Sequence, residues 1–253
     1  MSGDSGIYGL HAVLSLLEAA PERVRQLWVQ ASRENESLGR ILELAREAGI
    51  PVERVRRESL DRKAGGGRHQ GVVASAAEPP ALDEADLAGL LDALDRPPLL
   101  LVLDGVQDPR NLGACLRTAD AAGVDAVIVP RDRASGLTGA ARKAAAGAAE
   151  TVPLVRVVNL ARCLRALKER GIWVVGADAG SRDTIFGTDL AGPVAVVLGA
   201  EGSGLRRLTR EHCDLLVALP MLGRVESLNV AVTAGIVLYH ALSQRLPRAA
   251  RPD

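Results

Sequence analysis

Five short apolar runs between residues 99 and 219 constrain the fold of this chain more than any other feature. They span residues 99–103, 126–129, 172–175, 194–198 and 215–219. Each run has the length of a strand and almost no polar residues, which is typical of strands buried on both faces of a sheet. Helical segments separate the runs. One of them, 159–170, has Asn159 as its expected N-cap and Gly171 just past its end. This alternation predicts an α/β fold with a parallel sheet and helices on both faces.

The chain before residue 99 alternates the same two patterns less regularly. We expect a helix at 7–17, a strand at 24–29, a helix at 38–48 and a strand at 71–75. Prolines near residues 79 and 97 bracket a short acidic helix, and this change of composition marks the best domain boundary. The expected organisation is therefore an N-terminal domain at 1–77, a linker at 78–98, a second domain at 99–246 and a tail at 247–253.

The composition excludes several classes of protein. Aromatic residues make up only 2% of the 253 residues, so the chain has no stacking platform for bases. The formal net charge is zero, so the whole molecule does not attract polyanions. Cys115, Cys163 and Cys213 are widely spaced, which favours buried free thiols over a disulfide or metal site. With no secretory signal and no segment long enough to span a bilayer, we expect a cytoplasmic protein without metal or membrane partners.

Basic residues are nevertheless concentrated in two short stretches. A solvated surface is the simplest interpretation of both, and an RNA-contacting surface is the alternative. The glycine-rich segment 63–71 is likewise either a flexible connection or a loop that contacts RNA. The basic residues are Arg54, Arg56, Arg57, Arg62, Lys63 and Arg68 in the first stretch, and Arg206, Arg207 and Arg210 in the second.

Three segments that contain glycine or proline follow apolar runs, at 108–117, 198–204 and 219–230. Ligands of α/β sheets bind beyond the carboxyl ends of the strands, so three such loops predict one composite pocket. In the first segment Asn111 is either a helix N-cap or a functional residue. Arg117 either pairs with Asp120 at the surface or projects from an alanine-lined helix face beside a substrate.

The second and third segments carry further polar residues in unusual places. Glu201 lies within a glycine run, where a carboxylate would repel a pyrophosphate. The glycine spacing also differs from that of a dinucleotide-binding loop, which disfavours a nucleotide-dependent oxidoreductase. Ser227 is the expected N-cap of a long helix, although this does not explain why Asn229, a poor helix former, follows it so closely.

Taken together, the three segments resemble the three signature motifs of the SpoU (TrmH-like) branch of the SPOUT methyltransferases. The motifs are N-x5-R from Asn111 to Arg117, GAEG at 199–202 and SLNV at 227–230, in this order. Residues 7–13 and 69–71 match as well. Within this branch the chain is most similar to enzymes that methylate the ribose 2′-hydroxyl of a guanosine in bacterial 23S rRNA.

The resemblance implies a fold, a cofactor and a set of partners. The second domain would contain a parallel sheet with a deep trefoil knot, and the N-terminal domain would be a small α/β RNA-binding domain of the L30e type. The protein would act as a homodimer on 23S rRNA. S-adenosylmethionine would be held by Gly199, Leu219, Met221 and Leu228.

The resemblance also implies catalytic roles for Arg117, Asn111, Glu201, Ser227 and Asn229. A guanidinium stays protonated in proteins, so we expect Arg117 to stabilise the developing alkoxide rather than to act as a base. A non-catalytic RNA-binding factor with the same fold is the main alternative. The presence of polar residues in all three loops argues against it.

Overall fold

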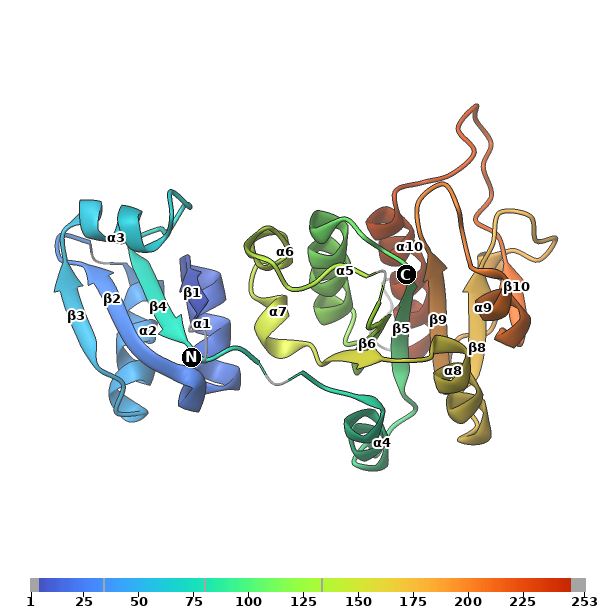
Figure 1. Cartoon of the computed structure of the whole chain (residues 1–253), viewed down its shortest axis with the longest axis horizontal. Coiled ribbons are helices and arrows are strands. Elements are labelled where there is room, and N and C mark those ends of the chain that lie inside the picture. Colours follow the sequence, from blue (N-terminus) through green and yellow to red (C-terminus); the bar gives the residue numbers. More distant parts are fainter. Residues whose placement is uncertain (1–4, 34, 80, 133, 247–253) are drawn as a thin grey trace. The chain divides into compact units, whose positions relative to one another are not determined.

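The computed structural model describes residues 5–33, 35–79, 81–132 and 134–246, and it divides the chain into two compact units (Figure 1). The N-terminal unit consists of Met1–Pro80 together with Ala146–Thr151. The C-terminal unit consists of Ala81–Ala145 and Val152–Asp253. The tail expected at 247–253 lies outside the described residues.

A four-stranded mixed sheet of order β1-β4-β2-β3 forms the centre of the N-terminal unit. Strand β4 pairs antiparallel with β1 and β2, while β3 pairs parallel with β2. The strands expected at 24–29 and 71–75 correspond to β2 and β4, whereas the short and largely exposed β3 was not expected. The strands are β1 (Ser5–Tyr8), β2 (Val24–Gln30), β3 (Val52–Val55) and β4 (Val72–Ala76).

Helices cover both faces of this sheet. Alternate residues of a strand point to opposite faces. Leu27 accordingly packs in a core with α1 (Leu10–Ala19) and α2 (Glu36–Glu47), whereas Trp28 packs against α3 (Arg57–Lys63). A 3₁₀ turn, Pro21–Arg23, precedes β2, and the short helix α7 (Ala148–Thr151) packs against α1.

The helix expected at 7–17 is wrong at its beginning. Ile7 and Tyr8 belong to β1, where they pair with Ala74 and Val73 of β4. Gly9 then adopts a φ of 98°, a conformation that suits glycine, and α1 begins only at Leu10. The apolar spacing of this segment fits a helix, but it does not reveal that glycine turns the chain between a strand and a helix.

A six-stranded parallel sheet of order β10-β8-β9-β5-β6-β7 forms the C-terminal unit. The five apolar runs all become strands, which confirms the expected parallel sheet. The expectation missed β7, which has an arginine in its short sequence. The strands are β5 (Leu99–Asp104), β6 (Ala126–Pro130), β7 (Leu154–Val157), β8 (Trp173–Ala177), β9 (Val194–Gly199) and β10 (Leu215–Val217).

Two layers of helices enclose this sheet. Helices α4 (Glu84–Asp92) and α8 (Leu160–Glu169) contribute to one core, with alternate residues of the central strands. On the other face α10 (Val230–Arg245) packs against β9 and α5 (Pro109–Ala121), and α6 (Gly139–Ala145) packs on α5. The remaining elements are a 3₁₀ turn, Ile185–Gly187, and α9 (Arg207–His212). Within the described ranges, none of the helices is both long and apolar enough to cross a membrane.

The segment 78–98, expected as a linker, is mostly part of the C-terminal unit. Leu82 forms a parallel bridge with Val155, and Leu87 of α4 is buried in the core beneath the sheet. Glu84 also accepts a hydrogen bond of 3.0 Å from the backbone of Val158. A few well-spaced leucines therefore attach an otherwise acidic helix to the sheet, and the compact unit begins near residue 81.

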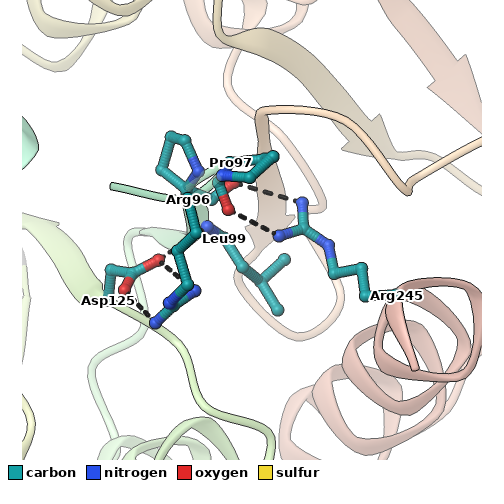
Figure 2. A network of polar contacts seen from close by, with 6 residues as sticks. Arg96, Pro97, Leu99, Asp125 and Arg245 are labelled. Carbon is teal, nitrogen blue, oxygen red and sulfur yellow. Dashed lines mark hydrogen bonds and ion pairs between the residues drawn. The ribbon is translucent and has the colours of Figure 1, made fainter. Parts of the chain in front are cut away.

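Two charged side chains fix the chain where it enters β5 (Figure 2). The carboxylate of Asp125 accepts a hydrogen bond of 2.8 Å from the backbone of Leu99 and pairs with Arg96 at 2.5 Å. Arg245, the last residue of α10, donates to the carbonyl oxygens of Pro97 and Pro98 at 2.9 and 3.1 Å. It also donates to the carbonyls of Leu190 and Gly192. The end of α10 is thereby joined to the start of the central strand.

We expect Arg245→Met to lower the free energy of unfolding of the C-terminal unit by about 2–4 kcal/mol, because several backbone carbonyls lose a charged donor. Arg207→Met is the matched control, since Arg207 pairs with Glu211 at the exposed surface and should contribute less than about 1 kcal/mol. The free energy of unfolding of each variant is measured by urea titration, with Trp173 fluorescence as the signal in a Trp28→Phe background. Equal losses for the two variants would contradict the role given to Arg245.

Candidate active site

The three polar segments meet at the carboxyl edge of the parallel sheet. Helix α5 begins just after β5, the glycine loop 199–204 follows β9, and residues 218–229 connect β10 to α10. Strands β5 and β9 are neighbours, with Asp104 in register with Gly199. The loops are therefore brought together by the order of the strands, although they are far apart along the chain.

One carboxylate oxygen joins all three segments. Oε1 of Glu201 accepts hydrogen bonds from Nδ2 of Asn111 at 3.1 Å and from Nδ2 of Asn229 at 2.5 Å. Nδ2 of Asn229 also donates to Oδ1 of Asn111 at 2.9 Å. The backbone N–H of Val230, the first residue of α10, approaches the same Glu201 oxygen at 3.4 Å. We call these three side chains the Asn111–Glu201–Asn229 network.

The N-caps of the two helices differ from those expected. Asp108 caps α5 and accepts a 2.7 Å hydrogen bond from the backbone of Arg110, and Pro109 occupies the first helical position. Asn111 therefore lies in the first turn, and its side chain reaches Glu201 instead. Asn229 caps α10 by accepting from Ala231 at 2.9 Å. The N-cap interpretation is thus wrong for both Asn111 and Ser227.

The glycine loop after β9 is closed tightly on itself. Ala200 and Gly204 form an isolated bridge, with a backbone hydrogen bond of 2.9 Å from Gly204 to Ala200. Gly202 and Gly204 adopt φ values of 78° and 64°. A Cβ atom on Gly199 would lie 2.1 Å from the carbonyl carbon of Gly204. Only glycine fits at position 199, and this close approach fixes the direction in which the loop leaves the sheet.

Asp104, which is not among the predicted site residues, anchors the other end of this loop. Its buried carboxylate accepts a 3.0 Å hydrogen bond from the backbone of Arg206 and pairs with the Arg206 guanidinium at 2.5 Å. The sequence could have indicated Asp104 as a site residue, because it is a charged residue at the end of an otherwise apolar strand, at the edge of the sheet where ligands bind.

Two cavities lie against the glycine loop. The first, of about 410 Å³, lies where the loops after β8, β9 and β10 meet, and the second, of about 370 Å³, lies at the start of α5. Both are within the size range of small-molecule sites. Glu201 lines both cavities. The 410 Å³ cavity is lined by Gly199, Leu219, Met221, Leu228 and Ser227, all predicted site residues, and the 370 Å³ cavity by Asp104, Asn111 and Arg206.

Arg117 lies apart from the Asn111–Glu201–Asn229 network and from both cavities. It lies about 9 Å along the helix axis from Asn111, and its side chain is exposed and lines neither cavity. Among the described residues, no hydrogen bond or ion pair of the Arg117 guanidinium is seen. The structure therefore places Asn111, Glu201 and Ser227 at the cavities, and hydrogen bonds join Asn229 to the first two. Arg117 lies apart from them and is available to a partner.

Other reactive groups do not contribute to the site. Burial raises the pKa of all three thiols, those of Cys115, Cys163 and Cys213, to about 12. Because the thiolate is the nucleophilic form, these cysteines are poorly suited to covalent catalysis at neutral pH. In the described part of the chain, no group of three histidine, cysteine or acidic residues is arranged to hold a metal ion.

The fold and the site are those of an RNA methylase family. Residues 98–239 match the SpoU rRNA Methylase family, and residues 7–82 match the family of RNA 2'-O ribose methyltransferase substrate binding domains. The chain belongs to the SpoU rRNA methylase family, which confirms the resemblance carried by the three motifs.

Individual proteins are similar over nearly the whole chain. The 23S rRNA (guanosine-2'-O-)-methyltransferase RlmB of Haemophilus influenzae is 54% identical over 95% of this chain and 98% of that protein. The same enzyme of Pseudomonas putida is 52% identical over 97% and 98%. Among solved structures, the SpoU methyltransferase AviRb of Streptomyces viridochromogenes in complex with the cofactor AdoMet is 26% identical with a TM-score of 0.77. That match covers 96% of this chain and 91% of AviRb.

We expect Gly199→Ala to lower the free energy of unfolding of the C-terminal unit by about 2–4 kcal/mol, because the added methyl group overlaps the Gly204 backbone. Gly192→Ala is the matched control, since a Cβ atom there would meet nothing within 4 Å. Urea denaturation of both variants gives the comparison. A Gly199→Ala protein as stable as Gly192→Ala would show that the loop is not closed as described.

Proposed function

We propose that this protein transfers a methyl group from S-adenosylmethionine (AdoMet) to the ribose 2′-hydroxyl of a specific guanosine in 23S rRNA. The observation that carries the proposal is the Asn111–Glu201–Asn229 network, which borders the cavity lined by the four expected cofactor-binding residues. The names of the similar RlmB enzymes, and the AdoMet complex of AviRb, support the substrate and the cofactor.

The 410 Å³ cavity fits this cofactor in size and chemistry. The Gly199 backbone lines one wall of the cavity, and Leu219, Met221 and Leu228 provide apolar surface around it. Glu201 places a carboxylate where it favours the positively charged sulfonium group. When bound, AdoMet supplies an electrophilic methyl group, so the chain itself has mainly to position the acceptor. We propose that the cavity lies within a deep trefoil knot, as in the family that the motifs resemble.

We assign the polar residues the following roles. Asn111, Glu201 and Asn229 fix the loops relative to one another, and Ser227, exposed at the cavity, holds the acceptor ribose. Arg117 stabilises the developing alkoxide and the neighbouring phosphate, and it remains protonated throughout. The proton of the hydroxyl leaves to phosphate or water.

Because Arg117 does not line the cavities of its own chain, we propose that the active site is completed in a homodimer. Val232 and Tyr239 support this arrangement, since they lie seven residues apart on α10 and are 51% and 50% exposed. Large apolar side chains on one helix face are typical of an interface. Arg117 of a second copy would then act on the substrate beside the network.

We further propose that the N-terminal unit recruits rRNA and that the C-terminal unit, from about residue 81, carries catalysis. The L30e-type fold of the N-terminal unit stays a prediction. A cytoplasmic location follows from an rRNA substrate and belongs to the same proposal.

We expect Arg117→Ala to reduce the rate of methyl transfer to 23S rRNA by roughly 10²-fold or more, because the alkoxide loses its cationic partner. Arg117→Lys should fail as well, because a point charge does not reproduce the planar guanidinium. The affinity for S-adenosylmethionine should stay within a few-fold. Single-turnover assays with labelled cofactor measure the rate. Arg165→Lys, on α8 at the other face of the sheet, is the control, and near-normal activity of Arg117→Lys would refute this role.

We expect the triple variant Arg56→Gln, Arg62→Gln, Arg68→Gln to bind rRNA more weakly and with less dependence on salt. These side chains are exposed on and around α3, and each phosphate that is no longer neutralised should reduce the slope of log affinity against log salt by about 0.7–0.9. RNA affinity across a salt series measures the slope. Arg40→Gln with Arg46→Gln, on α2 at the opposite face, should leave it unchanged. Equal slopes in both variants would mean that the basic stretch around α3 is only a solvated surface.

A further inference from the structure

The loop after β8 carries a buried carboxylate that borders the 410 Å³ cavity. Asp178 directly follows β8, and its side chain is only 8% exposed. Its Oδ1 atom accepts a 2.9 Å hydrogen bond from the backbone of Gly180. Its Oδ2 atom is buried and, among the described residues, accepts no hydrogen bond of good geometry, although Arg210 contacts it as an ion pair.

The position of Asp178 follows from the register of the sheet. Gly176 of β8 lies opposite Val197 of β9, so Asp178 lies at the level of Gly199, where the glycine loop begins. Both residues line the same cavity. Two other acidic residues border this cavity, Glu201 and Glu226, but both are exposed. Of these three acidic residues, Asp178 is therefore the buried one, and its Oδ2 atom, although paired with Arg210, can still accept a hydrogen bond.

A buried acceptor that lacks a hydrogen bond costs free energy, and a ligand that supplies a donor recovers it. We propose that Asp178 binds the cofactor by accepting a hydrogen bond from a ribose hydroxyl of S-adenosylmethionine. The inference rests on the proposed function, because it assumes that this cofactor occupies the 410 Å³ cavity.

The charge of the neighbouring Arg210 favours a ribose hydroxyl over the ammonium group of the cofactor as the donor to Asp178. S-adenosylmethionine also carries an ammonium group, but the guanidinium of Arg210 already neutralises Asp178 and would repel a second cation. A neutral hydroxyl meets no such repulsion and can share the carboxylate with Arg210. The ion pair thus holds Asp178 in place and selects an uncharged donor.

The test compares two ligands by isothermal titration calorimetry. S-adenosylmethionine carries both the ribose and the ammonium group, whereas 5′-methylthioadenosine keeps the ribose hydroxyls and lacks the amino acid part. Each is titrated into the full-length wild-type protein and into the variants Asp178→Ala and Asp178→Asn. Asp178→Asn keeps the shape of the side chain, so the test does not depend on the more disruptive alanine variant alone.

Asp214 provides a matched control. Its carboxylate accepts a 2.9 Å hydrogen bond from the backbone of Val174 and pairs with Lys168 at 2.7 Å, so it makes the same kinds of contact on the same sheet. It does not line the cavity. Asp214→Asn should bind both ligands as the wild type does.

We expect the Asp178 variants to lose about 10- to 100-fold in affinity for both ligands, by the same factor. An unchanged affinity for both would overturn the inference. A loss for S-adenosylmethionine without one for 5′-methylthioadenosine would also overturn it, because it would place Asp178 at the ammonium group. A wild-type protein that binds neither ligand would instead refute the proposed function itself.

Discussion

The shared oxygen of Glu201 is the interaction on which the site depends. Asn111 and Glu201 are 90 residues apart along the chain, and Asn111 and Asn229 are 118 apart, yet one carboxylate oxygen accepts from both amides. Hydrogen bonds to an ionised acceptor are short and about twice as strong as neutral ones. Asn111 lies in the first turn of α5 and Asn229 caps α10, and these two helices also pack against each other. Removing the carboxylate would therefore leave three loops with no common partner.

The parallel sheet makes this interaction possible. Strands β5 and β9 are central neighbours, and their carboxyl ends deliver Asp104 and Gly199 to the same edge. The pairing of Asp104 with Arg206 then holds the far end of the glycine loop, and the absence of a side chain at Gly199 lets the loop fold back on the strand. The site is thus a consequence of strand order first and of side-chain chemistry second.

Much of this could be predicted from the sequence, because strongly apolar runs have few alternatives to buried strands. The helix expected at 7–17 was wrong at its beginning, because Gly9 turns the chain at a point where the apolar pattern continues unbroken. Asn111 does not cap α5 because its side chain is engaged by a distant partner, Glu201, and Ser227 does not cap α10 because that helix begins later, with Asn229 as its N-cap. Asp178 was missed for a related reason, since its burial beside Arg210 depends on contacts between separate strands and loops.

The most direct test of the central claim is a map of ribose methylation in total RNA from cells with and without the gene for this protein. The account predicts that a single 2′-O-methylguanosine disappears from 23S rRNA without the gene. It should return with the wild-type gene and not with one that carries Arg117→Ala. A 23S rRNA with unchanged ribose methylation, or a methyl group lost from transfer RNA instead, would contradict the account.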